Sequence, residues 1–196
     1  MKRFVCTALV PLSLWFCLPQ TASASSEARE IDCTHSTMTV HVNKSGFLSA
    51  FGHNHEIQAP ILWGQVKEDG DPSVELRVDA RKLRVLDTEA SSDTRAKIQE
   101  TMLGNQVLDA DRYSEIHFRS TGVEPKGKDH WLVTGNLDLH GQTHSVTVEV
   151  TRKDGIYKGS GTLKQTTFGI TPVTVAGGTV KVKDDLKLEF EIALVK

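Results

Sequence analysis

Apolar and polar residues alternate one by one along most of this chain, and this period of two constrains the fold more than any other feature of the sequence. The alternation is clearest over residues 146–150 and 186–194, where every second residue is apolar. The same pattern appears over residues 38–42, 74–78 and 116–118. Successive side chains of a β-strand point to opposite faces, so each run predicts a strand with one apolar and one solvated face. Strands of this kind are typical of antiparallel sheets.

The segments between these runs are short and rich in glycine, aspartate and proline, which are residues of tight turns. Four of them, at residues 68–72, 125–129, 140–142 and 153–155, separate successive strands by hairpin-length loops. Roughly eight or nine strands follow from this spacing. With so few helical segments, the chain is expected to be an all-β protein whose sheet closes into a barrel or folds into a sandwich.

One segment departs from the period of two. Residues 91–104 carry apolar side chains at roughly helical spacing, begin with two serines and an aspartate, and end with Gly104. Serine and aspartate cap helix starts, and glycine commonly follows a helix end. We therefore expect one short helix here, packed on the barrel or across its mouth.

The first residues have the layout of a secretory signal peptide. A basic start precedes an apolar run, and residues 22–24 (Ala-Ser-Ala) have the small-x-small form of a cleavage site. The apolar run is shorter than the ~20 residues that a membrane-spanning helix needs, and no later segment is apolar enough to span. We predict a signal peptide over residues 1–24, a flexible tail over 25–35 and one domain over 36–196, in the periplasm or secreted.

Export leaves one cysteine, Cys33, because Cys6 and Cys17 lie in the predicted signal peptide. No intramolecular disulfide can then form, and the thiol pairs between molecules, stays buried, or is an incidental residue of the tail. Loss of Lys2 and Arg3 changes the formal net charge from −2 to −4, and the charges are interspersed. Without a basic block, the sequence argues against nucleic acid and anionic membrane surfaces as partners.

Four histidines stand in two pairs. His53 and His55 share one face of a predicted strand, and the other pair, His140 and His144, flanks a predicted turn. If their imidazoles converge, these four residues are candidate ligands of zinc or copper. A second interpretation places polar groups at a pocket rim, where they hydrogen-bond a ligand head group or seal the mouth; that set is His53, His55, Glu56 and His144. In a third, the rings cap strand ends or are simply solvated.

Several short motifs occur in a fixed order along the chain. They are Gly-Phe and Phe-Gly-His within residues 46–53, Tyr-x-Glu-Ile-x-Phe-x-Ser at 113–120, Gly-x-Leu-x-Leu-x-Gly-x-Thr at 135–143, and Phe-Gly-Ile at 168–170. Together they resemble the YceI-like family of exported proteins, over nearly the whole mature chain. Three positions depart from that family's pattern: Ser114 stands where proline is usual, His144 replaces a basic or aliphatic residue, and the second histidine of Gly-His-Asn-His occurs in only part of the family.

The resemblance implies a closed, lipocalin-like antiparallel β-barrel of about eight strands with one short helix, so that residues 36–196 form a YceI-like domain. It also implies an apolar interior that binds a long isoprenoid or fatty chain, with no cofactor and no catalytic centre. Burying each methylene of such a chain is worth ~0.8 kcal/mol. The aromatic residues expected to line the interior are Phe47, Phe51, Trp63, Phe118, Trp131, Phe168 and Phe190. Alternatively, these rings fill the core themselves.

Three functions from different classes follow. The first is an exported carrier or sequestrant of an isoprenoid or similar lipid, without enzymatic activity. The second is a histidine-based metal-binding or redox-accessory periplasmic protein. The third is an enzyme acting on a bound lipid with His53 as general base, although the sequence contains neither a nucleophile elbow nor a phosphate-binding glycine loop. A homodimer formed through an exposed strand edge is a further open alternative.

Overall fold

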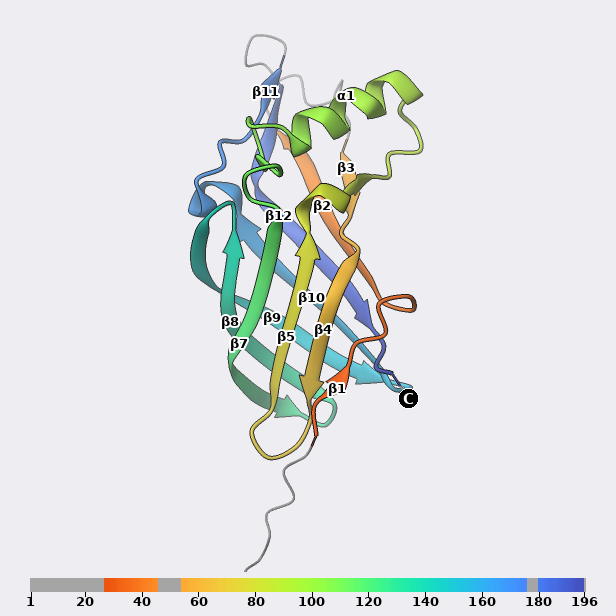
Figure 1. Ribbon diagram of the computed structural model, residues 1–196, viewed down its shortest axis with the longest axis vertical. Helices are drawn as coiled ribbons and strands as arrows, with labels where there is room; N and C mark the ends of the chain where they lie inside the picture. The colour runs from red at the N-terminus through yellow and green to blue at the C-terminus, as the bar shows by residue number, and fades with distance from the viewer. Residues whose placement is uncertain (1–26, 46–53, 176–179, 196) are drawn as a thin grey trace, which may run out of the picture.

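The computed structural model describes residues 27–45, 54–175 and 180–195 and arranges them as one curled antiparallel sheet with a helix at one end (Figure 1). Twelve strands occur in the described residues: β1 (Arg29–Glu30), β2 (Thr37–Ser45), β3 (His55–Gln58), β4 (Ile61–Lys67), β5 (Ser73–Asp79), β6 (Arg84–Val85), β7 (Glu115–Gly127), β8 (His130–Leu139), β9 (Gln142–Lys153), β10 (Ile156–Lys164), β11 (Thr174–Val175) and β12 (Val180–Ile192). The helix is α1 (Ser92–Leu103), and two 3₁₀ turns are η2 (Ala80–Lys82) and η3 (Gln165–Phe168).

The period of two becomes one inward and one outward face on the long strands. On β12, Leu186, Leu188 and Phe190 are half-buried. The alternating lysines and glutamates are exposed, and Glu191 pairs with Lys158 on the neighbouring strand β10. This confirms the antiparallel strands with one apolar and one solvated face.

Two of the predicted turns are two-residue hairpin loops. His140 and Gly141 join β8 to β9 with φ values of 52° and 72°, and Asp154 and Gly155 join β9 to β10 with φ values of 53° and 81°. Two consecutive positive φ values match the twist of the flanking strands, which is why such turns carry glycine after aspartate or asparagine. The turn chemistry in the sequence therefore sets the register of three successive long strands.

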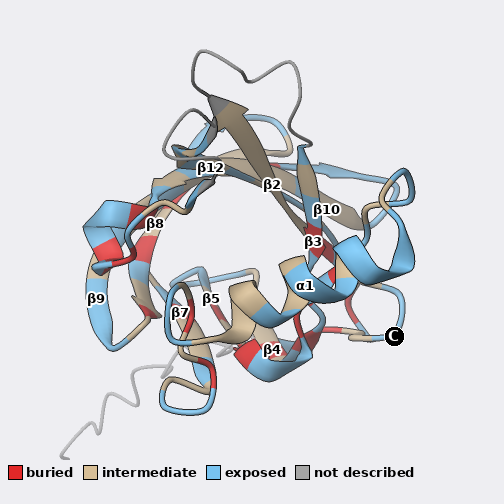
Figure 2. Cartoon of the chain, turned by 90° about the horizontal axis from the view of Figure 1, so that it is seen from above, coloured by how far each residue is buried: buried red, intermediate tan, exposed pale blue. Residues whose placement is uncertain are grey.

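The expected closed barrel of about eight strands is corrected by the strand pairing. Within the described residues, the hydrogen-bonded order is β1-β4-β5-β7-β8-β9-β10-β12-β2-β3-β6, and it has two ends. The sheet is therefore a half-barrel that curls around a central space (Figure 2). The two ends are β1, which pairs with β4, and β6, which pairs with β3, and the chain passes from β3 to β4 through Ala59 and Pro60. Proline has no N–H to donate to a strand ladder.

The N-terminal segment enters the sheet earlier than the predicted domain boundary at residue 36. β1 pairs with β4, and Ile31 is buried and forms an isolated bridge with Leu194. Residues 29–31 therefore connect β4 to the chain that follows β12. The polar composition that suggested a tail reflects the exposed Arg29 and Glu30, whereas Ile31 is buried.

The predicted helix is confirmed, and its boundaries have clear causes. The Ser91 side chain accepts a hydrogen bond from the backbone N–H of Thr94, and Gly104 follows the last turn. No residue of α1 is fully buried, but Ile98, Met102 and Leu103 pack against the core. The helix therefore lies across one end of the curled sheet (Figure 2). Neither it nor any other helix in the described ranges has the length and apolarity to cross a membrane.

Candidate ligand-binding cavity

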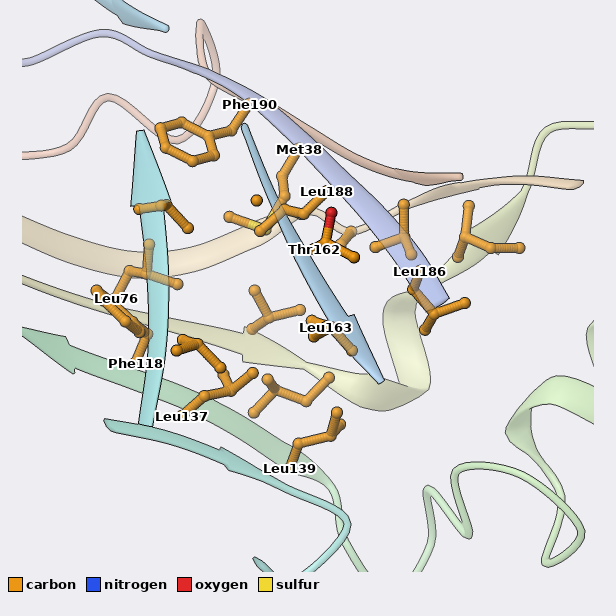
Figure 3. Close-up of a pocket in the computed structure, with 18 of the residues that line it drawn as sticks. Met38, Leu76, Phe118, Leu137, Leu139, Thr162, Leu163, Leu186, Leu188 and Phe190 are labelled. Atoms are coloured by element: carbon orange, nitrogen blue, oxygen red, sulfur yellow. The ribbon is translucent and has the colours of Figure 1, made fainter. Parts of the chain in front are cut away.

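The curled sheet encloses a cavity of about 1100 Å³ whose lining is mostly apolar. Its wall is built from strands that are far apart in the sequence, because each contributes the inward half of its alternating residues. Figure 3 shows part of this wall, including Met38, Leu76, Phe118, Leu137, Leu139, Leu163, Leu188 and Phe190. Pockets for small ligands are usually about 300–1,000 Å³. This cavity therefore has room for a molecule at or above the upper end of that range.

Two glycines leave room for aromatic rings to lie flat against the wall of the cavity. A Cβ atom added to Gly135 would come within 2.5 Å of Cζ of Phe118, and one added to Gly159 would overlap the ring of Phe190. Gly159 and Phe190 are direct partners between β10 and β12. Both rings therefore lie over glycine backbone, where a larger residue would push them toward the cavity. The two rings therefore form part of the wall without filling the cavity.

One end of the cavity, which we call the Glu68 end, is crossed by a polar cluster of Glu68, Arg152 and Tyr157. The Glu68 carboxylate accepts hydrogen bonds from the Tyr157 hydroxyl and, at 2.8 Å, from Nη1 of Arg152. Arg29 pairs with its other oxygen at 2.9 Å. Glu68 follows β4, whereas Arg152 and Tyr157 belong to β9 and β10, which are not neighbours of β4 in the sheet. The cluster therefore joins two separate walls.

The charges of the Glu68 end compensate one another. The hydrogen bond from Tyr157, followed by those from its arginine partners, holds the pKa of Glu68 below its ordinary value, although partial burial opposes this. Burial and the Glu68 carboxylate both raise the pKa of Tyr157. Trp131 lies beside the cluster, with its ring centroid 6.1 Å from that of Tyr157 and 6.0 Å from the Arg152 guanidinium carbon. Arginine over an aromatic face adds a cation–π attraction.

The opposite end, which we call the α1 end, is partly covered by the helix. Gln99 fastens α1 to the strand below it: its Oε1 accepts from the N–H of Val85 at 2.8 Å, and its Nε2 donates to the carbonyl of Leu83 at 2.8 Å. Arg95 Nη1 donates to the carbonyl of Asp87 at 3.1 Å. These contacts turn the face of α1 that carries Ile98 toward the cavity.

His55 lines the cavity at the α1 end and is held there by Asp87. It shares the inward face of β3 with the buried Ile57. Its Nδ1 lies 2.5 Å from Oδ2 of Asp87, whose side chain is only 5% exposed, while Oδ1 accepts from the N–H of Glu56 at 3.1 Å. A carboxylate on one ring nitrogen orients the ring and leaves Nε2 as the nitrogen for a ligand.

Three of the seven predicted aromatic residues line the cavity, namely Phe118, Trp131 and Phe190. Trp63 does not, because a register shift between Ile61 and Trp63 turns its ring outward, where Arg77 lies 5.5 Å from its centroid. Phe168 is 1% exposed and belongs to the packed core rather than the cavity wall. Phe47 and Phe51 lie outside the described residues.

The predicted rim residues are spread over different surfaces. Glu56 is exposed on the outward face of β3, with Oε1 3.7 Å from Nδ1 of His41. His144 has its ring against Phe168, at 5.3 Å between centroids, and is not among the cavity-lining residues described. Only His55 takes a position in the cavity wall, and His53 lies outside the described residues.

The candidate metal ligands do not converge in the part of the chain that the structure describes. His140 lies with Nδ1 3.1 Å from the carbonyl of Phe168, and His144 is held by Gln142 and Phe168. In the sheet order, β10, β12 and β2 separate this hairpin from His55 on β3. Among the described residues, no three His, Cys, Asp or Glu side chains form a group that could hold a metal ion.

Sequence reasoning missed two features of the α1 end. Lys44 has the same parity as Val40 and Val42, whose side chains line the cavity from β2. The alternation in the sequence could therefore have identified it as a lining residue. Asp87 has no such signal, because it lies 32 residues from His55 and the two meet only through the pairing of β3 with β6.

Comparison with known proteins identifies relatives across most of the chain. Residues 30–194 match the family described as YceI-like domain. A UPF0312 protein of Shewanella sp. (strain W3-18-1) is 25% identical over 149 residues, which cover 76% of this chain and 72% of that protein. A UPF0312 protein of Vibrio parahaemolyticus is 27% identical over 138 residues, covering 70% of this chain and 68% of the relative.

Solved structures show the same fold at lower sequence identity. The crystal structure of Burkholderia cenocepacia BcnA superposes with a TM-score of 0.65 at 19% identity, covering 85% of this chain and 99% of that chain. The YceI protein of Campylobacter jejuni superposes with a TM-score of 0.50 at 15% identity, covering 79% and 85%. The fold and the family match fit a lipocalin-like binding protein.

Proposed function

The chain belongs to the YceI-like domain family, and on that premise we propose that it is an exported protein that holds a long-chain isoprenoid or similar lipid in its apolar cavity, as a carrier or sequestrant. The observation that carries the proposal is the cavity of about 1100 Å³ with its apolar wall. Protein interiors are normally packed as densely as organic crystals, so apolar side chains around a space of this size lack contact partners. A bound hydrocarbon chain supplies those contacts.

Binding of such a chain needs little polar recognition. Each methylene transferred from water is worth ~0.8 kcal/mol, so a chain of many carbons binds through burial alone. Figure 3 supports this, because the labelled wall residues other than Thr162 are hydrocarbon or thioether side chains. The placement of Phe118 and Phe190 over glycine backbone keeps the interior available for the ligand.

Export is part of the proposal. Its support is the signal-peptide pattern of residues 1–24, which lie outside the described residues. Binding alone accounts for the geometry, and no catalytic step is assigned to any residue. An exported protein with an enclosed apolar cavity is suited to hold a water-insoluble molecule between membranes or outside the cell.

The test is organic extraction and mass spectrometry of the exported protein purified without detergent. We expect a lipid of several hundred daltons in stoichiometric amount. Extracts without lipid, from protein that also fails to take up isoprenoid or fatty chains in solution, would refute the proposal.

A pair of matched double variants makes the test specific to the cavity. Leu137→Trp with Leu188→Trp adds bulk on two cavity-lining residues, whereas Asn136→Trp with Lys187→Trp adds the same bulk at exposed positions next to them. We expect the first variant to lose most of the extracted lipid and the second to retain it. Equal lipid in both would place the ligand outside the cavity.

A further inference from the structure

A histidine interrupts the apolar wall of the cavity at the α1 end. His55 on β3 pairs with Val42 on β2, and both residues line the cavity. Ile57, two residues further along β3, is buried and lines the cavity as well. The imidazole therefore lies among side chains that would contact a hydrocarbon ligand, and its hydrogen bonds bear on the polar part of that ligand.

Asp87 determines which ring nitrogen of His55 carries a hydrogen. Its Oδ1 accepts from the backbone N–H of Glu56 at 3.1 Å, and its Oδ2 lies 2.5 Å from Nδ1 of His55. A carboxylate has no hydrogen to donate, so the shared hydrogen belongs to Nδ1. In the neutral imidazole the other nitrogen, Nε2, then carries a lone pair. Nε2 is therefore a hydrogen-bond acceptor on the side of the ring away from Asp87.

The pair of His55 and Asp87 is held in place by the elements around it. The Asp87 side chain is 5% exposed and that of His55 is 20% exposed. The Asp87 carbonyl accepts from Nη1 of Arg95 on α1 at 3.1 Å, and β6, which precedes Asp87, pairs with β3. A ligand in the cavity therefore meets an acceptor that is already oriented.

Charge does not select the head group at this end, because both signs are present. The Asp87 carboxylate lies directly beside the ring, while Lys44 and Lys97 also line the cavity here. Lys44 has an interaction partner of its own, and Lys97 is exposed, so that water weakens its attraction for an anion. A carboxylate or a fully ionised phosphate also lacks the hydrogen that Nε2 accepts. The hydrogen-bonding pattern is therefore the more specific signal.

From this geometry we propose that Nε2 of His55 accepts a hydrogen bond from the hydroxyl group of a long-chain alcohol, an isoprenoid or a fatty alcohol, whose chain lies in the cavity. The proposal rests on the proposed lipid-binding function and adds the chemical class of the head group and the end at which it lies. His55 touches the ligand, whereas Asp87 is a positioning residue that fixes the tautomer. Such a site discriminates against an analogue without the hydroxyl hydrogen, because the acceptor then stays unpaired.

The first test compares alcohols with their methyl ethers by calorimetric titration of the delipidated, detergent-free mature protein. Geranylgeraniol and hexadecanol are each paired with the methyl ether, which keeps the chain and the oxygen but has no hydrogen to donate. The ligands are supplied from cyclodextrin, and the affinities are corrected for binding to it. We expect each alcohol to bind about tenfold more tightly than its ether.

The outcomes of this titration separate the two proposals. Equal affinities of alcohol and ether would overturn the head-group proposal and leave chain binding intact. Tighter binding of hexadecanoate than of hexadecanol would also overturn it, since the acid offers Nε2 no hydrogen. Failure of all these ligands to bind would overturn the proposed function as well.

The second test removes the acceptor. His55→Phe keeps an aromatic ring and should bring the affinities of alcohol and ether within about twofold of each other. His41→Phe is the matched control, because His41 lies on the outer face of β2, with Nε2 3.1 Å from Glu189. This control should keep the preference for the alcohol. A preference that survives His55→Phe would refute the assignment, and thermal melts verify that both variants fold.

The third test exchanges the roles of the two ring nitrogens. In Asp87→Asn the amide oxygen can keep the N–H of Glu56, which leaves the amide NH₂ group facing Nδ1 of His55. Nδ1 then accepts and Nε2 carries the hydrogen, so the ether should bind as tightly as the alcohol. Nitrogen-15 NMR of the His55 ring should show the hydrogen moving from Nδ1 to Nε2.

Asp93→Asn is the control for this exchange, because it removes a carboxylate from an exposed position on α1. It should change neither the preference for the alcohol nor the nitrogen-15 spectrum of His55. An alcohol preference that persists in Asp87→Asn, after the hydrogen has moved to Nε2, would contradict the proposal. An unmoved hydrogen would show that Asp87 does not fix the tautomer and would contradict its positioning role.

Discussion

The Glu68 end and the α1 end of the cavity are built from the same alternating strands but are closed in different ways. At the Glu68 end, side chains from β4–β5 and β9–β10 meet directly, and opposite charges neutralise one another. At the α1 end, a helix without a fully buried residue is attached through Gln99 and Arg95. The first end depends on contacts between walls, the second on one added element that is held by a few hydrogen bonds and by the half-buried Ile98, Met102 and Leu103.

This difference indicates where the chain is most easily opened. Regions with few buried contacts have the lowest local free energies of opening. If the cavity holds a lipid as proposed, we therefore expect it to enter and leave at the α1 end, while the Glu68 end holds the walls in place. Changes in the wall, at each end, and beside the contact of Ile31 with Leu194 test this contrast in order of decreasing effect.

The largest effect is expected for Gly159→Val in the wall shared by both ends. Valine at this position overlaps the Phe190 ring, so the ring must move into the cavity. We expect a loss of about 2 kcal/mol in the free energy of unfolding, measured by urea denaturation, because overpacking costs about 1–3 kcal/mol. Lipid capacity should fall as well. Gly122→Ala is the control, since a Cβ there meets nothing within 4 Å, and a similar loss in both variants would contradict the role of the glycine.

At the Glu68 end, Glu68→Gln removes the charge that two arginines and Tyr157 contact. We expect a loss of about 1 kcal/mol in unfolding free energy at pH 7, since the carboxylate is partly shielded from solvent. Exposed Glu124, which pairs with Lys126, provides a control in Glu124→Gln, where the change should be close to zero.

The same residue predicts a pH dependence. The pKa of Glu68 is lowered in the folded protein, so its contribution is complete above the ordinary glutamate pKa of 4.5 and is lost as the pH falls through the lower folded value. Between neutral pH and pH 3, wild type should therefore lose more stability than Glu68→Gln. Parallel curves for the two proteins would show that the ionised Glu68 carboxylate does not contribute to the free energy of unfolding.

At the α1 end, Gln99→Ala removes both hydrogen bonds that fasten the helix to Val85 and Leu83. We expect a smaller loss of global stability, about 0.5–1 kcal/mol, together with faster lipid release in a stopped-flow exchange assay. Glu100→Ala, at the exposed neighbouring position, should leave the release rate unchanged. Release that is accelerated by Glu68→Gln but not by Gln99→Ala would reverse the assignment of the two ends.

The smallest effect concerns Cys33, beside the seam where Ile31 meets Leu194. Partial burial raises the pKa of its thiol, and its Sγ lies 3.5 Å from the carbonyl of Ile31. Because the thiolate is the reactive form, we expect Cys33 to react with a disulfide reagent at pH 8 a few-fold more slowly than in urea-unfolded protein. Equal rates would show that this seam opens freely.

Several local features were predictable from the residues themselves. The alternating runs identify β12 and β9, the Asp-Gly and His-Gly pairs identify the hairpin turns, and the serine-to-glycine segment identifies α1. Each depends on neighbours within a few positions. Phe118, Trp131 and Phe190 were expected in the wall from the family resemblance, since alternation alone does not say which face of a strand points inward.

Features that depend on how strands meet were not predictable. The register shift beside Trp63 turns a residue of the expected parity outward, and Asp87 reaches His55 only after β3 and β6 pair. The open ends of the sheet at β1 and β6 likewise have no signature in the alternation.

The sequence by itself determined most strands, their apolar faces, the hairpins and the helix, because alternation and turn geometry follow from the covalent chain over a few residues. Only the tertiary structure decided that Phe118 and Phe190 lie over glycines, that a cavity remains between the walls, and that Asp87 orients His55 in that wall. Those outcomes depend on pairing and bulges between segments far apart in the chain, which no local pattern specifies.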